Sequence, residues 1–458
     1  TDRFSFYGYP VELTPNLHKL TQTGAVFRRA YCYGGNTTAS MGAIFTSRFP
    51  YWPLEVPGGG GRWDVKHHFG FSRFQSADDL KPGIPDSLPT LPLILKEHGY
   101  TTVGLSTNPY LTRDFNFNRG FDFFEEFSSH WRQPYPGVEL VIKKLDAYLS
   151  QLKDQAFFAW IHLMDMHHPL REFEPYLEEA RSRGDRTGPP APPVSEWTQE
   201  AVHILTDFGS RHVPDWEEGG KGLKKARDMY ILAYEAELFR IDRQIGVLMD
   251  KLRQYGLEQD TLLMVVTDHG EEFAEHTYWD HRGQLYEPIV RGVWMMHNPL
   301  LFPSPVKVEE RVSLVDLMPT LVDLLGLKHR GTPFDGESRI SLLKKAPQGE
   351  DGLVFGVLDR RAYVIEGDHK LMLNGDYGKK SRGAHPDPPP APVELYNLKE
   401  DPHELHNLAE KSPEIADRLL VKLKKAFLNR GIRFWEEGSS KELSKKTLER
   451  LKSLGYIK

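Results

Sequence analysis

Long apolar runs, cysteine and excess positive charge are all scarce in this chain of 458 residues. No stretch of about 18 consecutive apolar residues occurs, so we expect no transmembrane segment in this chain. The single cysteine, Cys32, excludes an internal disulfide and leaves the redox compartment open. A formal net charge of -6 argues against a general binder of nucleic acids or anionic membranes, because both partners reward a basic surface. A locally basic cleft remains compatible with this balance.

The apolar segments predict an α/β fold with a smaller second unit. Strand-like runs alternate with amphipathic stretches over about the first 330 residues, as expected for a sheet covered by helices on both faces. After Gly326 the pattern changes to short strands and a capped helix. We therefore expect a large domain over residues 1–334 and a C-terminal α+β subdomain over residues 335–458. The predicted strands are 25–33, 101–106, 156–163, 262–267, 289–296, 352–357 and 362–365.

Three other features of the chain complete this outline. A long amphipathic stretch that ends at Gly256 predicts a core-facing helix. The proline-rich segments 188–194 and 385–393 predict surface loops. The sequence opens on TDRFSFYGYP without a methionine, and these residues show no signal peptide. Neither a compartment nor an oligomeric state follows from the sequence.

The segment TDHG follows the predicted strand 262–267 and carries the first candidate site. The strand end presents Asp268 and His269 to a cleft, and a carboxylate beside an imidazole suits a divalent metal ion. In the alternative interpretation Asp268 caps the next helix and His269 is packed. An isolated TDHG is compatible with both.

Two other predicted strands also end in unusual polar residues. Strand 25–33 runs into GGNTTAS, and strand 156–163 runs into MDMHHP. Ligand crevices in open α/β sheets lie at the carboxyl ends of the strands, so these segments and TDHG are expected to meet there.

Each of these segments has a chemical and an ordinary interpretation. Thr37 or Thr38 could offer a hydroxyl activated by a metal beside helix-start amides, or could simply cap the helix. His167 or His168 could donate a proton or contact an anion, or could be packed.

Further motifs are distributed along most of the chain. They are TPNLHKLTQTGAVFRRAY, TTASMGAIFTSRFP, GYTTVGLSTNPYL, IDRQIGVLMDKL, TDHGEEFAEH, VSLVDLMPTLVDLLGL and LYNLKEDPHELHNLAE. With these motifs in this order, the chain resembles the sulfatase branch of the alkaline phosphatase superfamily. The resemblance implies an alkaline-phosphatase-like fold with a mostly parallel central sheet flanked by helices. It also implies hydrolysis of a sulfate or phosphate-type ester at one divalent metal ion, Ca, Mn or Zn.

The resemblance also implies roles for individual residues. Thr37 matches the family nucleophile and would be a metal ligand together with Asp268 and His269. His167 matches the histidine that contacts the ester oxygen, and His281 stands where many relatives have a lysine near the leaving group.

Four departures from the family pattern bear on the chemistry. Thr37 cannot become the formylglycine of ordinary sulfatases, which requires Cys or Ser. Met41 replaces the signature arginine, and Thr107, Asn108 and Pro109 replace a Lys-Trp-His motif that holds sulfate. The family's upstream metal-binding aspartate would fall before residue 1, so the chain is expected to be truncated and one ligand short.

These departures favour a hydrolase that cleaves a phosphate- or phosphonate-type ester through Thr37. The first alternative is a sulfuric ester hydrolase, and the second is a catalytically silent binding module. The expected partner is a small-molecule ester, or a sulfate or phosphate ester linked to a glycan or lipid.

Overall fold

The computed structural model of the chain describes residues 2–49, 83–127, 136–168, 170, 174–183, 220–273, 275–276, 281, 284–329, 331, 333–344, 352–358, 361–374 and 391–429. Within these ranges, no helix combines the length and the apolar character needed to cross a bilayer.

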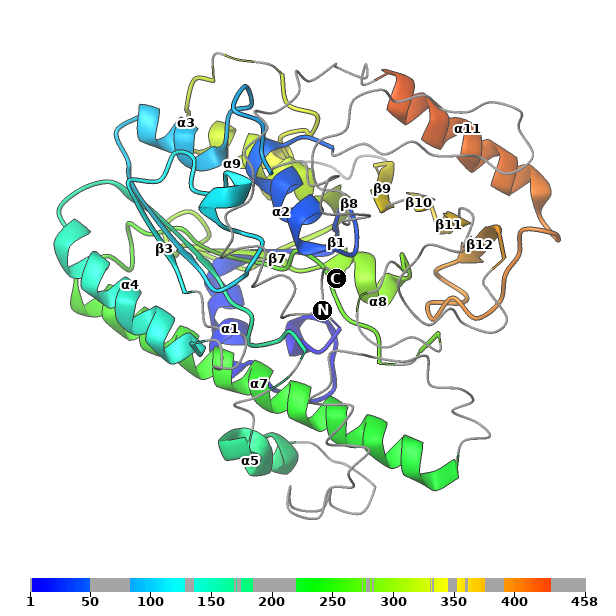
Figure 1. Cartoon of the computed structure of the whole chain (residues 1–458), viewed down its shortest axis with the longest axis horizontal. Helices are drawn as coiled ribbons and strands as arrows, with labels where there is room; N and C mark the ends of the chain where they lie inside the picture. The colour runs from blue at the N-terminus through cyan, green and yellow to red at the C-terminus, as the bar shows by residue number, and fades with distance from the viewer. Residues whose placement is uncertain are drawn as a thin grey trace.

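A mixed sheet of five strands lies at the centre of the molecule (Figure 1). The strand order is β5-β7-β1-β6, and β8 also pairs with β1. Strand β1 is parallel to β8 and antiparallel to β6 and β7. The strands are β1 (Gly24–Tyr31), β5 (Leu263–Val266), β6 (Arg291–Gly292), β7 (Trp294–His297) and β8 (Val306–Ser313).

A second sheet contains three parallel strands in the order β3-β2-β4. They are β2 (Thr101–Ser106), β3 (Phe123–Glu126) and β4 (Phe157–His162). The segment that follows β4 approaches the segment that follows β5, since the rings of His167 and His281 lie 5.1 Å apart, centroid to centroid.

Helices cover both faces of this sheet structure, and the strand residues alternate accordingly. Phe27 and Trp294 stack at a centroid distance of 4.0 Å in one core cluster, whereas Val26 and Met295 belong to the other. Apolar side chains on both faces explain the nearly continuous hydrophobic runs of β1 and β7. The first cluster includes α2 (Thr37–Thr46), α3 (Leu91–Glu97) and α9 (Leu317–Leu324), and the second includes α1 (Pro15–Leu20), α4 (Val138–Leu152) and α7 (Gly220–Gln254) (Figure 1).

A separate antiparallel sheet with the order β12-β11-β10-β9 follows in the sequence, and we call it the C-terminal sheet. Its strands are β9 (Val354–Leu358), β10 (Arg361–Glu366), β11 (His369–Asn374) and β12 (Val393–Asn397), and α11 (Pro413–Asn429) packs against it. The short elements are η1 (Ser5–Tyr7), η2 (Thr21–Thr23), η4 (Arg113–Phe115), η5 (Glu174–Tyr176), α5 (Leu177–Ser182), α8 (Glu287–Val290), η7 (Leu314–Asp316) and α10 (Ile340–Leu343).

The α/β class is confirmed, with two differences in detail. The five-stranded sheet is mixed, although a mostly parallel sheet was expected. The predicted strand 289–296 begins instead as α8, because Pro288 in the first turn favours a helix start, and the chain becomes extended only from Arg291. The proline-rich segment 188–194, and 385–390 of the second, lie outside the described residues.

Candidate active site

The ends of β1, β4 and β5 converge, as the sequence predicted. The hydroxyl oxygen of Thr37, after β1, lies 3.2 Å from Nε2 of His269, after β5. The ring of His281 lies 4.1 Å from the ring of His269 and 5.1 Å from that of His167, centroid to centroid. Residues more than 230 positions apart therefore form one polar cluster.

Thr37 is the first residue of α2, but Asn36 caps this helix. The Asn36 side chain accepts a hydrogen bond from the backbone N–H of Ala39 at 2.8 Å. Gly35 allows the preceding turn, since a Cβ at this position would lie 2.6 Å from the Ile289 side chain. The Thr37 hydroxyl is thus not used as the cap and is directed toward His269.

Asp268 and His269 form the centre of the cluster. Oδ1 of Asp268 accepts a hydrogen bond from the backbone N–H of His269 at 3.1 Å, and Oδ2 lies 3.5 Å from His269 Nε2. His269 Nδ1 lies 3.0 Å from the carbonyl oxygen of Gly270. With Nδ1 donating to this carbonyl, Nε2 keeps its lone pair for a metal ion. Gly270 is required here, because a Cβ would lie 2.0 Å from the Pro288 carbonyl oxygen.

The electrostatic environment keeps Asp268 ionised. Burial opposes its charge, but electrostatic interactions with the imidazoles of His269 and His162 and a hydrogen bond from Thr37 outweigh this effect, and the pKa of Asp268 lies below its ordinary value. Burial lowers the pKa of His162, and Asp268 partly offsets that shift. The cluster therefore combines an ionised carboxylate, Asp268, with one buried imidazole, His162, whose neutral form is favoured.

His281 is held by a carboxylate that the sequence analysis did not assign. Nδ1 of His281 lies 2.9 Å from Oε1 of Glu271, and both side chains are about nine-tenths buried, at 11% and 10% exposed. A carboxylate in this position orients an imidazole and stabilises its protonated form.

Of the two adjacent histidines after β4, His167 faces the cluster through its contact with the His281 ring. His168 is buried and stacks on Tyr230 of α7 at 6.0 Å, so it has a packing role.

The residues present fit a divalent cation. Oδ2 of Asp268 is buried and has no hydrogen-bond partner among the described residues, which is costly unless a ligand completes its surroundings. Asp268 Oδ2 lies 3.5 Å from His269 Nε2, and Thr37 Oγ1 lies 3.2 Å from the same nitrogen. Both distances match the separation of about 3–3.5 Å between atoms that share one small cation. His269, Glu271 and His281 also bring three ligand atoms within 4.8 Å of one another. His269 belongs to both groups.

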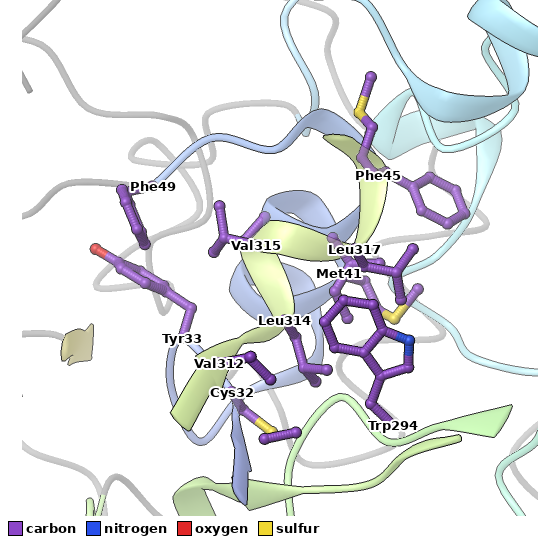
Figure 2. Packing of buried hydrophobic residues seen from close by; sticks show 14 of the residues in the cluster. Cys32, Tyr33, Met41, Phe45, Phe49, Trp294, Val312, Leu314, Val315 and Leu317 are labelled. Atoms are coloured by element: carbon purple, nitrogen blue, oxygen red, sulfur yellow. The ribbon is translucent and has the colours of Figure 1, made fainter. Parts of the chain in front are cut away.

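Three of the positions that depart from the family pattern, Met41, Thr107 and Asn108, contact other parts of the fold. Met41 is buried in the core cluster that contains Leu317 and Trp294 (Figure 2). Thr107 donates a hydrogen bond to the His162 carbonyl oxygen at 2.9 Å, and Asn108 contacts Met164. These three side chains supply no positive charge to the cluster.

Sequence reasoning missed Glu271 and His162. Glu271 could have been found, because it lies two residues after His269 within the TDHGEE motif. His162 lies within β4, where an apolar strand gives no sign of a polar role, and Nδ1 of this residue has no hydrogen-bond partner in the described part of the chain.

Two characterised relatives align with most of this chain. An ulvan-active sulfatase of Formosa agariphila is 24% identical over 473 residues, covering 92% of this chain and 71% of that protein. The N-sulphoglucosamine sulphohydrolase of Homo sapiens is 24% identical over 341 residues, covering 72% of this chain and 59% of that protein.

Two solved structures share the fold. BT4656, in complex with its substrate D-glucosamine-2-N,6-O-disulfate, aligns with a TM-score of 0.68 at 16% identity, covering 96% of this chain and 97% of that one. The phosphonate monoester hydrolase of Agrobacterium radiobacter aligns with a TM-score of 0.63 at 17% identity, covering 94% and 93%. These similarities confirm the alkaline-phosphatase-like fold. The sulfatase family model matches residues 1–327, and the chain therefore belongs to the sulfatase family of ester hydrolases.

Proposed function

We propose that this chain is a metal-dependent hydrolase that cleaves a phosphate- or phosphonate-type ester, with Thr37 as the nucleophile. The observation that carries the proposal is the position of the Thr37 hydroxyl, 3.2 Å from His269 Nε2 and released from helix capping by Asn36. Asp268, His269 and Thr37 would hold the cation.

The proposed reaction assigns one role to each residue. A bound cation would lower the pKa of the Thr37 hydroxyl and neutralise charge on the ester oxygens. Thr37 Oγ1, as the alkoxide that has released its proton to solvent, then bonds to phosphorus while the bond from phosphorus to the leaving oxygen breaks. His281 gives that oxygen a proton from Nε2, with Glu271 holding Nδ1, and His167 contacts an ester oxygen. Water next attacks phosphorus, His281 takes one of its protons, and the Thr37 oxygen leaves.

The choice of phosphorus rests on the chemistry of threonine. A phosphothreonine ester is open to attack by water at phosphorus. A sulfated threonine lacks the aldehyde-hydrate route by which sulfatases with formylglycine release sulfate. The second candidate is a sulfuric ester, and the names of the relatives favour it. If it holds, sulfated carbohydrates are the first substrates to examine, since BT4656 binds a disulfated glucosamine.

The test is turnover of four probes: an aryl sulfate, a phosphate monoester, a phosphate diester and a phosphonate ester, each with Ca, Mn or Zn. We expect hydrolysis of at least one phosphorus ester, and Thr37→Ala should lower kcat/KM at least about 100-fold. Thr38→Ala is the matched control, because the neighbouring Thr38 hydroxyl contacts the Asn36 side chain, at 3.4 Å, instead of His269. Peptide mass spectrometry after rapid acid quench should find a phosphoryl group on Thr37.

Two other outcomes would replace the proposal. Turnover of the aryl sulfate alone would establish the sulfuric ester hydrolase. No turnover of any probe, together with retained cation binding, would establish a silent binding module.

A further inference from the structure

His276 lies between the two residues of the proposed acid pair in sequence, yet its side chain points elsewhere. Glu271 and His281 belong to the cluster, whereas Glu272 and His276 have side chains that are 0% and 8% exposed and contact each other. The segment that follows β5 therefore presents one acid–imidazole pair to the site and buries a second pair behind it.

The second pair is attached to the region that follows the C-terminal sheet. His276 Nε2 lies 2.9 Å from the carbonyl oxygen of His403, and Nδ1 contacts Glu272. The His276 ring also stacks on Tyr286 at 3.7 Å, with an angle of 9° between the planes. Three different contacts fix the position of this one imidazole.

The backbone that offers the His403 carbonyl is itself held by buried charges. Glu404, the next residue, has a left-handed φ of 55°, a conformation that side chains other than glycine rarely adopt. Its carboxylate accepts a hydrogen bond from the Glu287 backbone N–H at 2.6 Å and lies 2.8 Å from Lys370 Nζ of β11. Lys370 also pairs with Glu287 at 3.2 Å. The C-terminal sheet thus fixes the His403 carbonyl relative to the large sheet.

We propose that His276 is a positioning residue that transmits the placement of the C-terminal sheet to Glu271 and His281. This inference rests on the proposed role of His281 as the leaving-group acid. The C-terminal sheet is then required for proton delivery, because it fixes the His403 carbonyl oxygen that His276 contacts. Displacing a reacting group by about 1 Å can cost about 100-fold in rate, so anchoring the Glu272–His276 pair would matter for the placement of the adjacent Glu271 and of the His281 that it contacts.

A purely structural role for His276 predicts different kinetics. If His276 only stabilised the fold, its loss would lower the amount of active protein and affect all esters equally. If it positions the acid, the loss depends on the leaving group, since a p-nitrophenolate ion leaves without a proton and an alkoxide does not.

The experiment compares an alkyl ester and a p-nitrophenyl ester of whichever class the full chain hydrolyses. His276→Phe keeps a ring on Tyr286 and removes both polar contacts. We expect kcat for the alkyl ester to fall at least about 10-fold and kcat for the p-nitrophenyl ester to change less than about 3-fold, with KM unchanged. His276→Gln retains a donor that can reach the His403 carbonyl and should recover part of the loss. If His276→Phe does not fold, His276→Gln takes its place in the comparison of the two esters.

A double-mutant comparison completes the test. His281→Ala should reproduce the leaving-group dependence, and adding His276→Phe to it should cause no further loss. Glu394→Gln is the matched control, since Glu394 accepts a hydrogen bond from the Tyr286 hydroxyl, at 3.2 Å, in the same interface, and Gln keeps the size of the side chain and an acceptor oxygen. Equal loss on both esters, or additive losses in the double variant, would overturn this inference and leave the proposed function standing. An unmodified chain that hydrolyses neither ester would overturn both.

Discussion

At the scale of single residues, the geometry of the site depends on which side chain caps a helix and which groups orient the histidines. Asn36 caps α2, and the Thr37 hydroxyl instead contacts His269, as its proposed role as nucleophile requires. Glu271 holds His281, and the Gly270 carbonyl holds His269. Sequence spacing alone could not separate Asn36 from Thr37 as the cap, because both residue types cap helices and they are adjacent.

Removing the Asp268 charge should weaken cation binding. Asp268→Asn keeps the side-chain volume, but a neutral amide is a poorer ligand than a carboxylate with a lowered pKa. We expect the Kd for the best of Ca, Mn and Zn to rise at least about 10-fold by isothermal titration calorimetry. Asp260→Asn, at an exposed carboxylate before the same strand, should leave the Kd unchanged. Equal affinities of Asp268→Asn and the unmodified chain would place the cation elsewhere.

At the scale of elements, α4 and α7 hold the segment that carries His167. Asp165 follows β4, accepts a hydrogen bond from the backbone N–H of Val138 at 2.9 Å, and lies 3.1 Å from Arg240. The sequence motif MDMHHP suggested chemistry for this segment, and the structure assigns its aspartate to packing between helices. A motif indicates where polar residues lie close together, but it does not show which of them stabilise the fold and which face the candidate site.

Strand prediction succeeded where the local pattern was complete. Residues 101–106 form β2 as predicted, since the β-branched run there is bounded by a glycine turn and polar residues. The stretch 289–296 was misjudged because Ile289 and Val290 favour a strand by composition, whereas the preceding proline and their burial against neighbouring elements favour a helical turn.

The buried Asp165 should produce a pH-dependent stability. Burial raises its pKa to about 6, from an ordinary value of 3.8, with Arg240 opposing the shift. The folded chain therefore binds a proton more tightly than the unfolded chain, and this group's contribution to stability falls as the pH rises from about 4 to about 6. The change is on the order of 3 kcal/mol at most.

Asp165→Asn should remove that dependence. The free energy of unfolding of the variant, relative to the unmodified chain, should increase between about pH 4 and pH 7 in urea titrations. Asp250→Asn, at a carboxylate that is 67% exposed, should show no such trend. A pH-independent difference for Asp165→Asn would contradict the assigned shift.

At the scale of the whole molecule, a buried ionic group joins the C-terminal sheet to the rest of the chain. Lys370 is fully buried between Glu404 and Glu287, at 2.8 and 3.2 Å. The sequence predicted a second unit from about residue 335, and that division stays a prediction. Nothing in the sequence pattern indicated how the units meet, because the three charges are far apart along the chain and each alone resembles a surface residue.

Lys370→Met should therefore be costly. It leaves two carboxylates facing each other in a buried position, and breaking such a group by removing one partner costs about 3–5 kcal/mol of unfolding free energy. The matched control is Lys422→Met, which breaks the partly exposed pair with Glu366 and should cost about 0–1 kcal/mol. Chemical unfolding followed by tryptophan fluorescence measures both. Similar losses of unfolding free energy for the two variants would show that the buried ionic group stabilises the fold no more than the partly exposed pair.

The burial of Met41 has a consequence for how this chain can change over evolutionary time. Introducing the family's arginine at this position would place a charge in the apolar cluster of Leu317 and Trp294, with no carboxylate provided for it (Figure 2). Making room for the longer side chain would require neighbouring side chains to shrink, and each such change would open a cavity. The packing of Met41 thus disfavours an arginine at this position, whichever residue supplies the nucleophile.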